Sequence, residues 1–235
     1  MARFVLVHGG FHGGWCWKRV APLLRAAGHE VWTPTLTGLG ERAHLATEAT
    51  DLSTHIRDVV AVLDWEELEN AILVGHSYSG MVITGVAEQA HGRIRRLVYL
   101  DGMVPRPDSR AMEMMGGDLS GRLSAAGAGE AGQNIPPPEF FGIFDPEDAD
   151  WLKRRLTPQP PKSFTERLPL PEQRAEMLPR TYIHCTDPMM VPPGRFLEKL
   201  KASPDWRFHT LATGHDTMIS DPQGLAEILA REAEA

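Results

Sequence analysis

The chain has 235 residues and a formal net charge of −7, from 24 Lys and Arg against 31 Asp and Glu. This length suits one large domain with a sizeable core, and the lack of a concentrated basic cluster argues against a nucleic-acid partner. No apolar run approaches the roughly 18–20 residues that cross a membrane, so we expect no membrane partner.

The two cysteines and the beginning of the chain bear on where the protein works. Cys16 and Cys185 each fall in an apolar stretch, and so low a cysteine content fits a reducing compartment. The first predicted strand, residues 3–7, begins almost at once, which leaves no place for a signal peptide. These features predict a soluble, cytoplasmic protein.

The first strand runs directly into a glycine-rich loop, residues 8–14, with the sequence His-Gly-Gly-Phe-His-Gly-Gly. A phosphate-binding loop is the obvious alternative, but neither G-x-x-x-x-G-K-[ST] nor G-x-G-x-x-G spacing is present. We therefore interpret the loop as one whose backbone N–H groups face an oxyanion. Gly10 is the first choice for that donor and Phe11 the second.

The chain then alternates between apolar strands and amphipathic helices. We predict a helix at 15–27, a strand at 30–33, a loop at 34–46, a helix at 51–63 and a strand at 71–75. The next residues, Gly75-His76-Ser77-Tyr78-Ser79-Gly80, separate that strand from a buried helix. We interpret this strand, sharp turn and helix as a nucleophile elbow of the G-x-S-x-G type, which lifts the Ser77 hydroxyl clear of the sheet.

The segment 103–179 changes character, because it holds twelve of the 19 prolines and cannot form a plain strand–helix repeat. We predict an inserted, mostly helical lid, with its clearest helix at 145–156 and a mobile glycine-rich run at 116–132. Alternation resumes with a strand at 180–185, a helix at 193–202, a strand at 206–211 and a helix at 222–233. With the strand at 95–100 this makes six strands in a mainly parallel α/β sheet, so residues 1–102 and 180–235 form the core and 103–179 the cap.

Three side chains that could cooperate in catalysis follow the ends of predicted strands. Ser77 needs a base to accept its proton, and that base must itself be oriented. His215 follows the strand that ends near residue 211, and Asp187 follows the strand that ends at 185, so all three reach the same edge of the sheet. Asp101, at the end of the strand 95–100, is the alternative acid. The order Ser77, Asp187, His215 is the chain order of α/β-hydrolases, and we prefer Asp187 to Asp101 as the acid.

The remaining candidate residues surround this proposed triad. The N–H of Tyr78, directly after the nucleophile, would complete the oxyanion hole with Gly10. Phe11 and Trp151 are candidates for an apolar substrate pocket, and His12 could either line that pocket or make a structural bond within its loop. We expect His8 to brace the glycine-rich loop and His76 to pack in the interior. Ten histidines show no metal-binding spacing, so we expect neither a metal nor a cofactor.

With these residues in view, the chain resembles the plant methylesterase and hydroxynitrile lyase branch of the α/β-hydrolases, together with its bacterial esterase relatives. The resemblance covers residues 3–101 and 180–232 and rests on the following segments: residues 4–10 with 12–15, residues 27–31, residues 72–77 with 80–81, residues 182–187, and residues 214–215. It implies a six-stranded parallel sheet under a small cap, a triad of Ser77, Asp187 and His215, Gly10 as an oxyanion donor, and a homodimer.

Two departures from the lyases bear on the reaction. The lyases have a threonine where this chain has Gly9, and a lysine where it has Asp216; that lysine stabilises the cyanide leaving group, which a carboxylate would oppose. We therefore predict a serine esterase that cleaves a small to medium carboxylic ester through an acyl-enzyme. The alternatives are thioester, lactone or lyase chemistry on the same triad, and a non-catalytic protein that binds a small ligand.

Overall fold

A parallel sheet forms the centre of the computed structural model, which describes residues 1–115, 135–190 and 194–234. Within these residues the six strands lie in the order β2-β1-β3-β4-β5-β6, and every neighbouring pair is parallel. The strands are β1 (Arg3–Val7), β2 (Glu30–Trp32), β3 (Ala71–His76), β4 (Ile94–Leu100), β5 (Arg180–Cys185) and β6 (Trp206–Leu211). The six predicted strands and their parallel arrangement are thus confirmed, with ends that differ by one residue at most.

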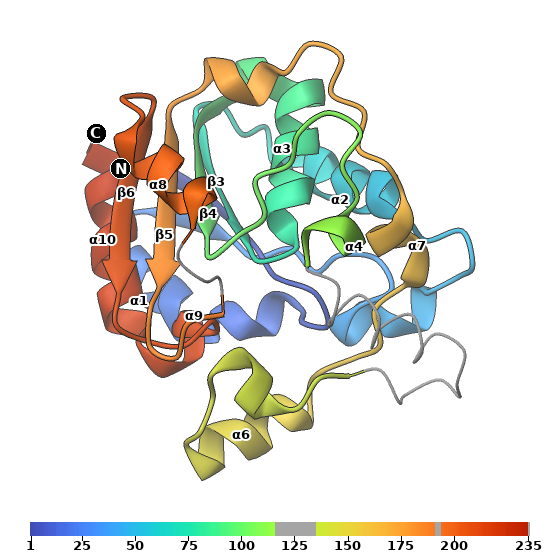
Figure 1. Ribbon diagram of the computed structural model, residues 1–235, viewed down its shortest axis with the longest axis vertical. Coiled ribbons are helices and arrows are strands. Elements are labelled where there is room, and N and C mark those ends of the chain that lie inside the picture. The colour runs from blue at the N-terminus through green and yellow to red at the C-terminus, as the bar shows by residue number, and fades with distance from the viewer. Residues whose placement is uncertain (116–134, 191–193, 235) are drawn as a thin grey trace.

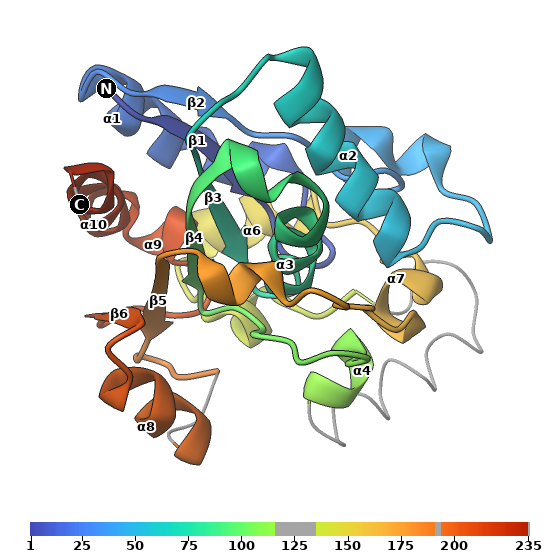
Figure 2. The same cartoon turned by 90° about the horizontal axis from the view of Figure 1, so that it is seen from above.

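Helices cover both faces of the sheet because its central strands are buried on both sides. On one face α1 (Val20–Ala26) packs against α10 (Pro222–Glu234), and on the other α2 (Leu52–Trp65) packs against α3 (Ser79–Ala90) (Figures 1 and 2). The helix α8 (Arg195–Ala202) connects β5 to β6, and α9 (Thr217–Ser220) precedes α10. Short 3₁₀ turns complete this part of the chain: η1 (Gly14–Lys18), η2 (Gly40–Leu45) and η3 (His91–Arg93).

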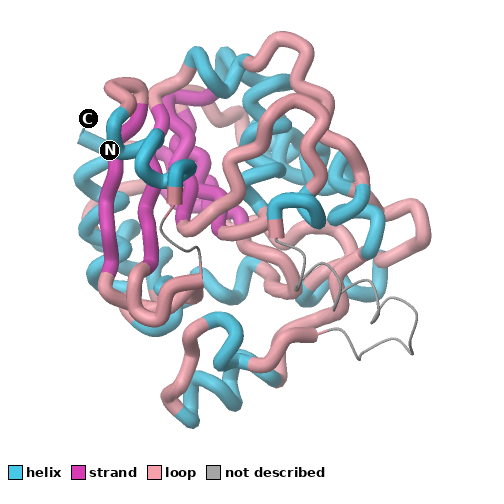
Figure 3. The backbone as a smooth tube through the Cα atoms, in the orientation of Figure 1, coloured by secondary structure: helices cyan, strands magenta, loops and turns pink. Residues whose placement is uncertain are grey.

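Between β4 and β5 the described residues include several short helices separated by loops (Figure 3). These are α4 (Ala111–Met114), η4 (Pro138–Phe141), α6 (Pro146–Lys153), α7 (Pro161–Thr165) and η5 (Arg174–Met177). The predicted helix at 145–156 corresponds to α6, which lies beyond the carboxyl ends of the strands (Figure 1). The predicted mobile run at 116–132 lies outside the described residues, and the division into a core and a lid stays a prediction.

Hydrogen bonds fasten this intervening segment to the loops at the carboxyl edge of the sheet. The Thr157 amide donates to the carbonyl of Phe11 at 2.9 Å, and the Gly40 amide donates to the Thr157 hydroxyl at 3.0 Å. The amide of Asp216 donates to the carbonyl of Phe141 at 3.0 Å. The segment therefore has a defined position over the loops that carry the candidate site. Among the described residues, no helix combines the length and the apolar character needed to cross a membrane.

Candidate active site

Ser77 occupies a strained turn between β3 and α3. Its φ is 54°, in the left-handed region that a non-glycine residue seldom adopts, and its amide donates to the carbonyl of Leu100 at 3.1 Å. This geometry is that of a nucleophile elbow. The sequence departs from the expected G-x-S-x-G, because Ser79 stands where the second glycine would fall and Gly80 follows it. The Ser79 hydroxyl donates to the carbonyl of His8, which ties the elbow to the glycine-rich loop.

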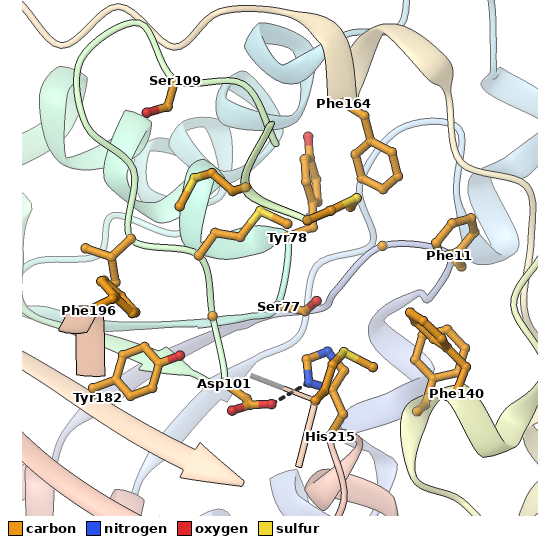
Figure 4. Close-up of a pocket in the computed structure, with 18 of the residues that line it drawn as sticks. Phe11, Ser77, Tyr78, Asp101, Ser109, Phe140, Phe164, Tyr182, Phe196 and His215 are labelled. Carbon is orange, nitrogen blue, oxygen red and sulfur yellow. Dashed lines mark hydrogen bonds and ion pairs between the residues drawn. The ribbon is translucent and has the colours of Figure 1, made fainter. Parts of the chain in front are cut away.

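The ring of His215 lies between Ser77 and a carboxylate. Its Nδ1 is 2.6 Å from Oδ2 of Asp101, and both side chains are almost fully buried. Figure 4 shows Ser77 on the opposite side of the ring from Asp101, with its hydroxyl directed into the same cavity. A carboxylate that accepts from Nδ1 leaves Nε2 free to take a proton from a hydroxyl. The arrangement can therefore activate Ser77.

The preference for Asp187 over Asp101 as the partner of His215 is wrong in this geometry. Asp187 is exposed, its amide donates to the carbonyl of Thr213 at 3.0 Å, and within the described residues no contact joins it to His215. Thr186 also bonds across to β6. Backbone pairing thus continues beyond Cys185 to Leu211 and Thr213, and it leaves the Asp187 side chain exposed. Asp101, by contrast, follows Leu100 directly at the end of β4.

Asp101 is held as an anion by several donors. In addition to His215, Nδ1 of His184 and the amide of Cys185 each lie 3.2 Å from Oδ1. Burial alone would raise the pKa of Asp101, but the hydrogen bonds from His184 and His215 outweigh it and hold that pKa below its ordinary range. His184 was not among the predicted site residues. Its place on β5, at the edge of the sheet where the candidate acids lie, is the signal that could have found it.

The two predicted oxyanion donors, Gly10 and Tyr78, both line the cavity beside Ser77. Within the described part of the chain, no hydrogen bond engages the amide of either residue, so both N–H groups are free to donate. The second choice, Phe11, is already occupied, because its amide donates to Oε1 of Gln159 at 2.9 Å. Gln159 lies in the segment between β4 and β5, and no sequence motif marked it as a site residue.

His8 braces the glycine-rich loop, as predicted. Its Nδ1 donates to the carbonyl of Gly9 at 2.8 Å, and its Nε2 accepts from the amide of Leu36 at 3.0 Å. This pattern requires a neutral ring, in agreement with burial, which lowers the pKa of His8 to about 3. The Gly9 carbonyl belongs to the same peptide group as the Gly10 amide. Since hydrogen bonds in a chain polarise one another, His8 strengthens Gly10 as a donor.

A cavity of about 560 Å³ opens above these residues. Aromatic side chains lie on two sides of Ser77: Phe11, Phe140 and Phe164 on one, and Tyr182 and Phe196 on the other (Figure 4). Phe11 is therefore located where it was predicted. The remaining lining residues are Gly102, Met103, Val104, Arg106, Ser109, Met114, Met115, Phe141 and Met190.

Two predicted substrate contacts do not lie in this cavity. His12 is completely buried between the carbonyl of Gly10 and Asp216. It therefore makes a structural bond within its loop, which was the second of its two predicted roles, and does not line the pocket. Trp151, on α6, packs its ring edge-on against Trp15 at 5.1 Å and lies under the guanidinium of Arg155. Both assignments are corrected.

The described residues also bear on metal and cofactor binding. They contain no group of three or more His, Cys, Asp or Glu side chains arranged to hold a metal ion. Cys16 and Cys185 are both free thiols in the interior. Ser77, His215 and Asp101 all line the cavity.

Comparison with known proteins agrees with this geometry. Residues 4–228 match the α/β-hydrolase family. The chain is 43% identical to a carbendazim-hydrolysing esterase of Nocardioides sp. (strain SG-4G), over 98% of this chain and 99% of that protein. An extracellular α/β-hydrolase from a Paenibacillus species, described as sharing structural and functional homology with tobacco salicylic acid binding protein 2, superposes with a TM-score of 0.84 at 25% identity, over the whole of both chains. The Arabidopsis methylesterase MES16 superposes with a TM-score of 0.76 at 26% identity, over 100% of this chain and 99% of that one.

The chain belongs to the α/β-hydrolase family, in the branch that contains plant methylesterases and bacterial esterases. Within that family it is a serine hydrolase of carboxylic esters, and its substrate is a small molecule.

Proposed function

We propose that Ser77, His215 and Asp101 are the catalytic triad of this esterase. The single observation that supports it most is the 2.6 Å bond between Nδ1 of His215 and Asp101, with Ser77 across the ring in the same cavity. Asp101 would fix the tautomer of His215 and stabilise the imidazolium that forms. This assignment replaces Asp187 with Asp101 and keeps the other two predicted residues.

The reaction would proceed in two halves. Ser77 Oγ attacks the ester carbonyl as His215 takes its proton, and the resulting oxyanion accepts hydrogen bonds from the amides of Gly10 and Tyr78. His215 then gives the proton to the departing alcohol and leaves an acyl group on Ser77. In the second half, a water activated by His215 attacks that acyl group, which releases the acid and restores the serine.

The cavity favours a small, neutral ester with an aromatic part. Within the described residues, Arg106 is the one charged side chain of its lining apart from the proposed triad. Aromatic rings on both sides of Ser77 would hold a flat group on one side and a small apolar group on the other. A relative that hydrolyses carbendazim, the methyl carbamate of a bicyclic aromatic amine, supports the same class. We therefore propose methyl esters and carbamates of aromatic compounds as substrates.

The alternative functions would require different groups at the cavity. Cyanohydrin cleavage is disfavoured, since Asp216 occupies the position of the lyase lysine and its carboxylate is directed to His12, away from the cavity. Thioesters and lactones would use the same groups and belong in the assay. A purely binding protein has no need of an oriented imidazole beside a serine that lines the same cavity.

The test is hydrolysis of carbendazim, methyl benzoate, p-nitrophenyl acetate, a thioester and a lactone by the wild type and by Ser77→Ala. We expect the wild type to hydrolyse at least one aromatic ester or carbamate, and Ser77→Ala to lose about 10⁴-fold or more of kcat. A fluorophosphonate should label the wild type at Ser77. Absence of both hydrolysis and labelling, with ligand binding retained, would support the binding protein instead.

A further inference from the structure

His12 faces an acceptor on each of its two ring nitrogens. Nδ1 lies 2.7 Å from the carbonyl oxygen of Gly10, and Nε2 lies 2.9 Å from Oδ2 of Asp216. A neutral imidazole carries one N–H and can donate only once, whereas the imidazolium donates from both nitrogens. Because a carbonyl and an ionised carboxylate cannot donate in return, both bonds form together only when His12 is charged, provided that Asp216 is ionised; the lowered pKa of Asp216 favours that form.

Asp216 supplies the counter-charge for that ring. Both side chains are completely buried, and the second carboxylate oxygen of Asp216 lies 3.7 Å from Nε2 of His76. Burial disfavours charge on either group, but the two are close enough that Asp216 raises the pKa of His12 while His12 lowers the pKa of Asp216. The combination is a buried ion pair directly behind the catalytic cavity.

Three titratable groups near the pair, His8, His76 and Cys16, are neutral. Burial lowers the pKa of His8 and of His76 to about 3, with the nearby His215 adding to the effect on His76. Burial raises the pKa of the Cys16 thiol well above its ordinary value. None of these groups competes with His12 for the positive charge or with Asp216 for the negative one.

The pair connects the two loops that the reaction uses. His12 holds the carbonyl of Gly10, whose amide is an oxyanion donor, and Asp216 follows His215 directly in the chain. Trp15 stacks on the His12 ring at 5.3 Å and Phe141 approaches it edge-on at 5.0 Å, so water is excluded from the bond.

We propose that the His12–Asp216 ion pair is a positioning device that fixes the Gly10 amide and the His215 imidazole relative to one another. The proposal rests on the proposed function, in which those two groups act on the same tetrahedral intermediate. Oxyanion donors act only when they already point at the site where the charge develops, and a misplacement of about 1 Å can cost about 10²-fold in rate. Neither His12 nor Asp216 touches the substrate in this account.

The first test is Asp216→Asn, measured with the best substrate and with phenylboronic acid, which binds the serine as a tetrahedral anion. We expect kcat and the affinity for the boronate to fall together by about 10²-fold while KM changes less than about threefold. A change confined to KM would overturn the proposal, as would an unchanged kcat with an unchanged boronate affinity.

A matched control separates positioning from simple loss of stability. At the opposite end of the sheet, Glu232 is a buried carboxylate that lies 2.8 Å from Nε2 of His209. Glu232→Gln also removes the charge of a buried carboxylate, which pairs with the partly exposed His209 and with Arg96 at 3.0 Å, so it should lower the melting temperature with kcat and boronate binding close to wild type. Equal losses of kcat in Asp216→Asn and Glu232→Gln would mean that the effect is general destabilisation.

The protonation of His12 is tested independently of catalysis. ¹⁵N NMR of the wild type at pH 7 should show both ring nitrogens of His12 protonated, with the signal assigned from its loss in His12→Gln. A wild-type spectrum with one unprotonated His12 nitrogen would overturn the proposal even if Asp216→Asn does not fold. Absence of hydrolysis and of serine labelling in the wild type would instead refute the proposed function, while the NMR result would still stand.

Discussion

Three residues of the candidate site adopt a backbone conformation that side chains disfavour. The φ angle is 68° at Phe11, 54° at Ser77 and 43° at Asp101. A left-handed conformation costs roughly 1–2 kcal/mol for a residue with a side chain. Each of the three directly follows, or closely follows, a buried strand, and the sheet therefore holds them in place. The strain lies where a nucleophile, a carboxylate and a pocket wall must be aimed at one point.

Two buried, neutral histidines make the stability of the fold dependent on pH. The pKa of His8 and of His76 falls from 6.5 to about 3 in the folded chain, chiefly because burial disfavours the charged ring. Between these values the unfolded chain binds protons that the folded chain excludes, so stability falls as the pH drops. His12, whose pKa is raised, acts in a different pH range: its contribution to stability is complete below pH 6.5 and is lost as the pH rises above that value.

The contribution of His8 can be isolated with His8→Asn, which keeps a donor for the Gly9 carbonyl but cannot titrate. At pH 5 the proton excluded from His8 costs about 2 kcal/mol relative to pH 7.5. Urea unfolding should therefore show a drop in the unfolding free energy between these pH values that is about 2 kcal/mol smaller in His8→Asn than in the wild type. Equal drops would mean that His8 titrates normally.

At the scale of elements, the elbow depends on the close approach of α3 to the chain that leaves β4. A Cβ added at Gly80 would overlap the carbonyl of Met103, and one added at Gly75 would lie 2.5 Å from the carbonyl oxygen of Ser79. Gly80→Ala should therefore destabilise the fold by about 3 kcal/mol, since a backbone atom must move. Gly92→Ala, with no atom within 4 Å of the added Cβ, is the control.

Thermal and urea unfolding measure this difference directly. We expect Gly92→Ala to unfold within about 0.5 kcal/mol of the wild type. A Gly80→Ala protein as stable as Gly92→Ala would show that α3 and residue 103 are not in contact.

The sequence was sufficient to predict the strands and the elbow, because each has a local pattern, and it placed His215 at the edge of the sheet where the structure has it. Apolar runs predict β1 to β6, and the sharp turn between β3 and α3 predicts that the Ser77 hydroxyl is lifted clear of the sheet. The acid was harder, since Asp101 and Asp187 both end strands at the same edge of the sheet. What separates them is a continued pairing with β6 at residues 186–187, which no local pattern records. His12 and Trp151 were wrongly predicted as substrate contacts for a related reason. Aromatic residues line pockets and also pack against one another, so residue type alone does not distinguish the two.

At the scale of the whole molecule, we propose that the described residues between β4 and β5 select the substrate. They provide Phe140, Phe141 and Phe164 to the cavity and are fastened to the sheet edge by Thr157 and Gln159. Their fold could not be derived from sequence, because proline-rich connections carry no periodicity that predicts where short helices pack. The class of reaction follows from the α/β sheet and its edge, whereas the choice of ester would follow from these residues.

The most direct test of the account compares Asp101→Asn with Asp187→Asn in the same ester assay. If Asp101 orients His215, Asp101→Asn should lower kcat/KM by about 10³–10⁴-fold, and Asp187→Asn should stay within about threefold of the wild type. Both proteins should keep the wild-type circular dichroism spectrum. The opposite ranking, with Asp187→Asn inactive and Asp101→Asn active, would contradict the triad proposed here.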